Sequence, residues 1–253
     1  MHMPEPGLLA FWVFAALAAW VQTLTGFALG FILLGSAGLL GLLPLPQVAA
    51  VTSVLVIVNT GLVLSRSARE ANRRALGWLV IGAFPGLIAG FILLQFLAGG
   101  AVETLRLLLG IVVAGSALWL AWRPAVLAQP TSGPAFCVTG MVGGVLGGLF
   151  ATSGAPVIWQ MYRQPMTLPA VRTTLIAFFF VTQSMRLGLV AVTGGLNLGL
   201  MTAAAGAIPA VALGTIVARR FPPGIAPARI RQVALVLLLL SGLGMIATAL
   251  PRL

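Results

Sequence analysis

Residues 148–159, GLFATSGAPVIW, interrupt a long apolar run with small and helix-breaking residues. Thr152, Ser153 and Gly154 are followed closely by Pro156. Glycine and proline both weaken the hydrogen-bond ladder of a helix. A broken helix also leaves unpaired N–H groups at the start of its next half. The stretch therefore predicts two half-helices joined by a short non-helical segment.

The chain on both sides of this break has the composition of an integral membrane protein. Of its 253 residues, 60% are hydrophobic and 7% are charged, and the mean hydropathy is +1.12. Uncharged runs cover residues 6–65, 75–102, 124–162, 187–218 and 232–251. About 20 apolar residues suffice for a helix to cross a bilayer, and the runs lack the strict alternation of barrel strands. We predict an all-α polytopic membrane protein embedded in the lipid bilayer.

The order of the apolar segments suggests an internal repeat. The first half has segments at 8–24, 27–43, 46–64, 75–97 and 103–122, and the second at 134–150, 155–164, 169–191, 198–218 and 230–250. In each half, a shorter, glycine-rich pair precedes three long segments. LPQVA at 45–49 and LPAVR at 168–172 open the first long segment of each half. We predict transmembrane repeats over 1–126 and 127–253, within one membrane domain.

The charges orient these segments. All 14 basic residues are arginines, and with three glutamates they give a formal net charge of +11. In a soluble protein this charge would suggest nucleic acid as a partner, but arginine also marks the cytoplasmic loops of membrane proteins. We therefore predict no nucleic-acid partner. The multi-pass chain is placed in the plasma (inner) membrane, with the arginine-rich loops 65–74 and 219–231 in the cytoplasm.

Five segments in each half make consecutive halves inverted relative to one another. Inverted repeats with broken helices are typical of secondary transporters. Each repeat is predicted to hold a broken helical hairpin and three long transmembrane helices. The first break is expected at Thr25-Gly26 in QTLTGFALG, residues 22–30. The alternative is that unrelated apolar segments resemble one another by chance.

The two breaks together predict a binding site for a small anion. Unpaired N–H groups and the helix dipole attract anions to the start of a half-helix. Hydroxyl groups add donors, and glycine lets an oxyanion approach the backbone. The candidate binding residues are Gln22, Thr25 and Gly26 in the first break and Thr152, Ser153 and Gly154 in the second. Small residues also let helices pack closely, and this alternative remains open.

Two long motifs resemble a known family. GGVLGGLFATSGAPVIW, followed by LPAVRTTLIAFFFVTQSMRLGL, resembles the second repeat of the sulfite/sulfonate exporter family TauE/SafE. TGFALGF and LPQVAAVTS resemble its first repeat, so the resemblance covers nearly the whole chain. It implies a membrane transporter that exports small sulfur-containing anions, sulfite or an organosulfonate such as sulfoacetate. Relatives often carry a Gly-Gly-Pro-Pro turn where this chain has Ser153-Gly154-Ala155-Pro156.

Arg172 and Arg186 lie within the otherwise apolar segment 169–191. In a helix their spacing leaves a net angle of about 40° and a rise of about 21 Å, so they share a face, on which Gln183 also lies. Charged residues in membrane helices usually face a cavity, and an arginine fork suits a pair of sulfonate oxygens. Either arginine could instead extend to the membrane interface.

Thr52 and Asn59 occupy the corresponding segment of the first half. Their separation of seven positions puts them on one helix face. They could line the anion path opposite the arginines, although hydrogen bonds between packed helices explain such residues equally well.

Acidic and metal-ligating residues are scarce. Glu5, Glu70 and Glu103 lie outside the long segments or at their edge, and no aspartate occurs. We predict no cofactor, no metal site and no enzymatic activity, because the paired aspartates and acidic metal ligands of membrane enzymes are missing. Export driven by the membrane potential is predicted, at about 2.3 kcal/mol per charge per 100 mV. The alternatives are an anion channel and an uptake permease for another small organic anion, and the oligomeric state stays open.

Overall fold

The computed structural model describes residues 5–40, 44–122, 125–196, 198–221, 224 and 227–250, and this part of the chain contains helices and no strand. The α-helices are α1 (Glu5–Thr25), α2 (Leu29–Leu40), α3 (Leu45–Ser67), α4 (Arg73–Ala98), α5 (Val102–Ala121), α6 (Gly133–Phe150), α7 (Gly154–Tyr162), α8 (Leu168–Val192), α9 (Leu198–Arg220) and α10 (Pro227–Ala249). One turn of 3₁₀ helix, η1 (Ala68–Glu70), lies between α3 and α4. The predicted all-helical class is confirmed. The end of the expected segment 27–43 and part of the loop 219–231 lie outside the described residues.

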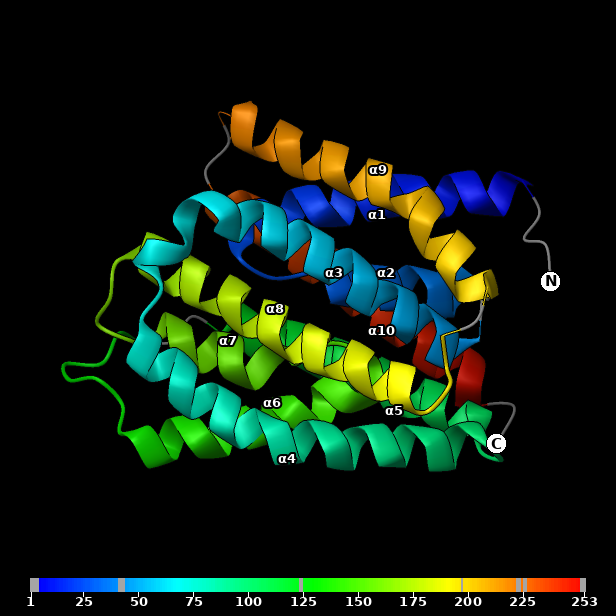
Figure 1. Cartoon of the computed structure of the whole chain (residues 1–253), viewed down its shortest axis with the longest axis horizontal. Coiled ribbons are helices and arrows are strands. Elements are labelled where there is room, and N and C mark those ends of the chain that lie inside the picture. The colour runs from blue at the N-terminus through cyan, green and yellow to red at the C-terminus, as the bar shows by residue number, and fades with distance from the viewer. Residues whose placement is uncertain are drawn as a thin grey trace.

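Seven helices of the described chain are long and apolar enough to cross a membrane, namely α3 to α6 and α8 to α10. The apolar part of α1 is shorter, and α2 and α7 have only 12 and 9 residues. A full crossing takes about 20 residues, so α2 and α7 are too short to cross. The helices run roughly along the long axis of the molecule (Figure 1). The chain is an integral membrane protein.

Both predicted helix breaks are present. The first spans residues 26–28, between α1 and α2, and the second spans residues 151–153, between α6 and α7. Three break residues have positive φ, with values of 85° at Gly26, 106° at Ala28 and 50° at Ala151. This backbone region is unfavourable for residues that carry a Cβ atom. The two turns are therefore held in shape by contacts with the rest of the protein.

Glycines set the closest helix pairs. On α4, a Cβ atom added to Gly82, Gly86 or Gly90 would lie 1.8, 2.2 or 2.1 Å from a carbonyl oxygen of α6. On α9, a Cβ atom at Gly214 would lie 2.2 Å from the carbonyl oxygen of Ala16 in α1. Only residues without a side chain allow backbones to approach this closely. Helices α4 and α6, and likewise α1 and α9, are in direct backbone contact.

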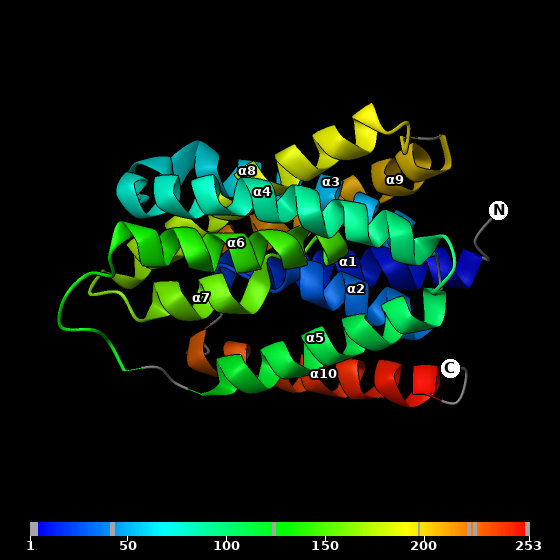
Figure 2. The same cartoon turned by 90° about the horizontal axis from the view of Figure 1, so that it is seen from below.

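The most extensive helix pairs each have a counterpart in the other half of the chain. Helix α1 packs on α9 and α6 packs on α4; α3 packs on α9 and α8 packs on α4. The pairs α3–α8 and α5–α10 are their own counterparts when α1–α5 are exchanged with α6–α10. Figure 2 shows α5 and α10 side by side as a layer next to the other helices.

The arginine-rich parts of the chain gather at one end of the molecule. The connection from α3 to α4 and the end of α9 both lie at the left of Figure 1. The connections from α4 to α5 and from α8 to α9 lie at the right. Arg66, Arg73, Arg74, Arg219 and Arg220 thus belong to the left end, which we call the arginine-rich end. Glu103 and Arg106, at the start of α5, belong to the opposite end.

Candidate functional site

The two helix breaks lie against each other in the interior. A Cβ atom added to Gly30, in the first turn of α2, would lie 3.0 Å from the carbonyl oxygen of Ala151 and 3.5 Å from Cβ of Thr152. A Cβ atom added to Gly154, the first residue of α7, would lie 2.0 Å from Cζ of Phe31. The starts of the two half-helices, α2 and α7, are therefore in contact.

A small space of about 20 Å³ lies where the breaks meet, which we call the central space. Its polar lining includes Gln22, Thr152 and Gln183, all predicted as binding residues. Phe31 and Phe179 contribute aromatic rings. The volume is about that of one water molecule. Sulfite or a sulfonate group would enter only if the two breaks moved apart.

Arg186 is the centre of a hydrogen-bond network next to this space. Its side chain is 0% exposed, Nε donates to the carbonyl oxygen of Gly148 (3.2 Å) and Nη1 donates to Oγ of Ser53 (3.1 Å). Oγ of Ser53 lies 2.8 Å from Oε1 of Gln183, and Nε2 of Gln183 donates to the carbonyl oxygen of Ala151 at 2.9 Å. Helix α8 therefore holds the end of α6 and the second break. The predicted proximity of Gln183 and Arg186 is observed.

Three buried polar atoms in this region have no hydrogen-bond partner within the described residues: Nη2 of Arg186, Nε2 of Gln22 and Oγ1 of Thr52. The methyl group of Thr52 would lie 3.7 Å from a Cβ atom at Gly30, so Thr52 also borders the meeting point of the breaks. Leaving buried donors unpaired is costly, above all on a charged group. All three atoms can donate a hydrogen bond, which is the type of group that binds an anion.

The first break satisfies much of its backbone with its own side chains. Oε1 of Gln22 accepts from the N–H of Leu29 (3.0 Å), and Oγ1 of Thr25 accepts from the N–H of Phe27 (3.4 Å). In the second break, Ser153 does not cap α7; its hydroxyl lies 3.5 Å from Oγ1 of Thr182. The start of α7 therefore has no side-chain cap, which leaves it suited to an anion.

Asn59 lies apart from the central space. Its Nδ2 donates to Oγ1 of Thr215 (2.7 Å) and to Oγ1 of Thr23 (3.0 Å). These bonds join α3 to α9 and α1. Thr52 and Asn59, expected on one face, therefore have different surroundings, and Asn59 is not brought together with the other candidate residues.

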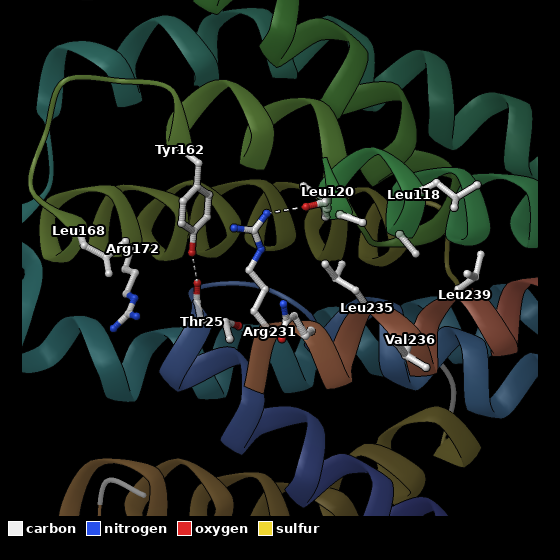
Figure 3. Close-up of a pocket in the computed structure, with 13 residues that line it drawn as sticks. Thr25, Leu118, Leu120, Tyr162, Leu168, Arg172, Arg231, Leu235, Val236 and Leu239 are labelled. Carbon is white, nitrogen blue, oxygen red and sulfur yellow. Dashed lines mark hydrogen bonds between the residues drawn. The ribbon is translucent and has the colours of Figure 1, made fainter. Parts of the chain in front are cut away.

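A larger cavity of about 720 Å³, which we call the inner vestibule, opens at the arginine-rich end (Figure 3). Its polar lining includes Thr25, Tyr162, Arg172 and Arg231. The apolar lining comes from α5 and α10, with Leu168 from α8. Figure 3 shows Tyr162 between the two arginines. Arg172 thus lies in this vestibule, away from Arg186.

Tyr162 and Gly26 form the boundary between the inner vestibule and the first break. The hydroxyl of Tyr162 donates to the carbonyl oxygen of Thr25 (2.8 Å), and its ring lies 5.1 Å from the guanidinium carbon of Arg231. A Cβ atom added to Gly26 would lie 3.3 Å from Cα of Arg172. Gly26 therefore allows the first break to rest directly on α8.

Four residues that matter here were not among the predicted site residues: Phe31, Ser53, Tyr162 and Arg231. Ser53 bridges Arg186 and Gln183, and Tyr162 is the only tyrosine in the chain. The rarity of tyrosine was a usable signal. In the sequence, Arg231 is one of several arginines in the loop 219–231. Spacing within one helix does not show which side chains of other helices it contacts.

Comparison with known proteins gives a family match over most of the chain. Residues 11–245 match the family described as Sulfite exporter TauE/SafE. The chain belongs to this family. A TauE protein of Cupriavidus necator, described as a "Probable sulfite/organosulfonate exporter", is 40% identical over 213 residues, which cover 84% of this chain and 83% of that protein. No solved structure matches the chain. Membership of the TauE/SafE family confirms the resemblance carried by the second break.

Proposed function

We propose that the chain exports a small sulfur-containing anion, sulfite or an organosulfonate such as sulfoacetate, and binds it where the two helix breaks meet. The observation that carries this proposal is the buried guanidinium of Arg186, whose Nη2 lacks a partner beside two further unpaired donors, Nε2 of Gln22 and Oγ1 of Thr52. A sulfonate presents several oxygens that can accept from such donors. The name of the relative from Cupriavidus necator supports the substrate class and the direction.

The inner vestibule supplies the route to this site. Arg172 and Arg231 attract an anion, while Leu235 and Leu239 offer an apolar wall to the carbon part of an organosulfonate. Tyr162 donates to the carbonyl oxygen of Thr25 at the boundary between this vestibule and the first break, and we propose that this bond breaks when the anion passes to the central space. With room for about one water molecule at the centre, the structure favours a carrier over an open anion channel.

The fold is proposed to consist of inverted repeats, 1–126 and 127–253. The exchange pattern of the helix pairs supports this division. So do three residue pairs of α4 and α9, Gly82 with Gly206, Pro85 with Pro209 and Gly90 with Gly214, because each is separated by 124 positions. The arginine-rich end is assigned to the cytoplasmic side of the inner membrane, following the positive-inside rule.

Accessibility labelling tests this orientation. In a Cys137→Ala background, the variants Glu70→Cys and Gly195→Cys place a single thiol at opposite ends of the molecule. An impermeant reagent added outside intact cells should label position 195 and leave position 70 unlabelled until the cells are opened. Labelling of both thiols from one side would contradict the inverted repeats.

The driving force is proposed to be the membrane potential. Arginine does not titrate in proteins. The described glutamates lie at helix ends rather than in the middle of a span, because Glu70 ends η1 and Glu103 is the second residue of α5. When an anion leaves a cell with a negative interior, its free energy falls by about 2.3 kcal/mol per charge per 100 mV.

The test uses proteoliposomes loaded with a permanently charged sulfonate, with valinomycin and potassium setting the voltage. They should show saturable efflux that rises with voltage. Flux that ignores voltage and follows a proton gradient would contradict potential-driven export. Preferential uptake would favour an uptake permease.

A further inference from the structure

Two arginines occupy equivalent places in the proposed repeats. Arg106 is the fifth residue of α5, and Arg231 is the fifth residue of α10. Similarly, Leu45 is the first residue of α3, and Leu168 is the first residue of α8. The second member of each pair lines the inner vestibule at the arginine-rich end.

The first members of these pairs line a separate cavity at the opposite end of the molecule. This cavity has a volume of about 140 Å³, and its lining includes Leu45, Pro46, Leu105 and Arg106. It is therefore the counterpart of the inner vestibule, and it is much smaller than the 720 Å³ of that vestibule. We call it the outer cavity. The cavity at the arginine-rich end is therefore the wider of the two.

The two arginines have different electrostatic partners. Nη1 of Arg106 forms an ion pair with Oε1 of Glu103 at 3.5 Å, one helical turn earlier. Arg231 donates instead to the carbonyl oxygen of Leu120 and faces the ring of Tyr162. Position 228, which corresponds to Glu103 in α10, is an alanine. A carboxylate thus competes for the arginine at the outer end, and the equivalent position at the inner end carries none.

We propose that the outer cavity is an anion-release site for the exported sulfonate, and that Glu103 weakens it by competing for Arg106. This inference rests on the proposed function. When the repeats exchange conformations, the outer cavity widens as the inner vestibule narrows, and the anion meets Arg106. Nε of Arg106 is buried and has no hydrogen-bond partner among the described residues, so it offers a donor to that anion. The carboxylate of Glu103 repels the anion and shares the guanidinium, which favours release.

The test compares the two faces of the protein in proteoliposomes of uniform orientation. The half-saturation concentration for sulfoacetate is measured by counterflow at each face. Glu103→Gln should lower it about twofold to fivefold at the outer face, the range expected for a partly exposed ion pair, and leave the inner face unchanged. Arg106→Gln should raise it at the outer face. Glu70→Gln, the same change at the arginine-rich end, is the matched control and should leave the outer face unchanged.

A mirror variant keeps the inference testable if Arg106→Gln does not fold. Ala228→Glu places a carboxylate three residues before Arg231 and should raise the half-saturation concentration at the inner face alone. If Glu103→Gln affects both faces equally, or neither, the release site is refuted while sulfoacetate transport by the unaltered protein still supports the proposed function. If the unaltered protein carries no sulfonate or sulfite, the proposed function itself fails.

Discussion

The two helix breaks meet at one point but are held by different means. The first break is stabilised from its own hairpin, where Gln22 accepts from Leu29 and Thr25 accepts from Phe27. The second is stabilised from α8, through the bonds of Arg186 to Gly148 and of Gln183 to Ala151. The first break is therefore held mainly from within its own hairpin, with an added bond from Tyr162 of α7, whereas the second is held from α8. The side chains that hold the second break also belong to the proposed anion site, so we expect anion binding to change the shape of this break.

The largest expected effect comes from Arg186→Gln. The change removes the central cation and its two hydrogen bonds, and charge-assisted bonds contribute about 1.5–3 kcal/mol each. The initial rate of sulfonate efflux from proteoliposomes should fall at least about 100-fold. Arg186→Lys should recover part of the rate because it keeps the charge but loses the fork. The exposed Arg69→Gln serves as the control, and normal efflux by Arg186→Gln would remove Arg186 from the site.

The glutamines of the two breaks provide a direct comparison. Gln183→Ala leaves the carbonyl oxygen of Ala151 without its donor and removes the contact with Ser53. The free energy of unfolding should therefore fall by about 2–3 kcal/mol. Gln22→Ala removes one cap from α2, which should cost about 1 kcal/mol. Thermal unfolding of the purified variants in one detergent should therefore give a lower midpoint for Gln183→Ala. Equal midpoints would show that the two breaks are held equally.

Tyr162→Phe tests a long-range hydrogen bond of the first break. The variant loses the hydrogen bond to the carbonyl oxygen of Thr25 and keeps the ring beside Phe27. Losing this hydrogen bond should lower the free energy of unfolding by about 1 kcal/mol. It should also ease passage of the anion from the inner vestibule to the central space. Efflux measured below saturation should rise severalfold. An unchanged rate would mean that this bond does not control access.

The smallest expected effects come from substitutions that relieve backbone strain at the two breaks. Ala28 and Ala151 both have positive φ, but the 106° of Ala28 lies far from the left-handed minimum, whereas the 50° of Ala151 lies close to it. Ala28→Gly should therefore stabilise the protein by about 1 kcal/mol, and Ala151→Gly by less. Midpoints of thermal unfolding compare the two. A larger gain for Ala151→Gly would reverse the comparison, because it would identify the second break as the more strained.

The breaks were predictable from the sequence because glycine, proline and hydroxyl residues are exceptional within apolar runs. Gln183 and Arg186 were predictable as neighbours because the helical period decides which positions share a face. That period does not decide which helix lies opposite. Asn59 therefore bonds to Thr23 and Thr215 although its spacing matched Thr52. The bridging role of Ser53 depends on the contact between α3 and α8, which only the folded chain reveals.

The glycine contacts between α4 and α6, and between α1 and α9, have a mechanical consequence. Where side chains interlock, one helix can move along another only by lifting each ridge out of its groove. At Gly82, Gly86 and Gly90 there is no ridge to lift, because carbonyl oxygens of α6 lie directly on bare backbone. These surfaces have no interlocking side chains. We therefore expect each broken hairpin to shift along its neighbouring helix at a low energetic cost, as in a shear motion of packed helices.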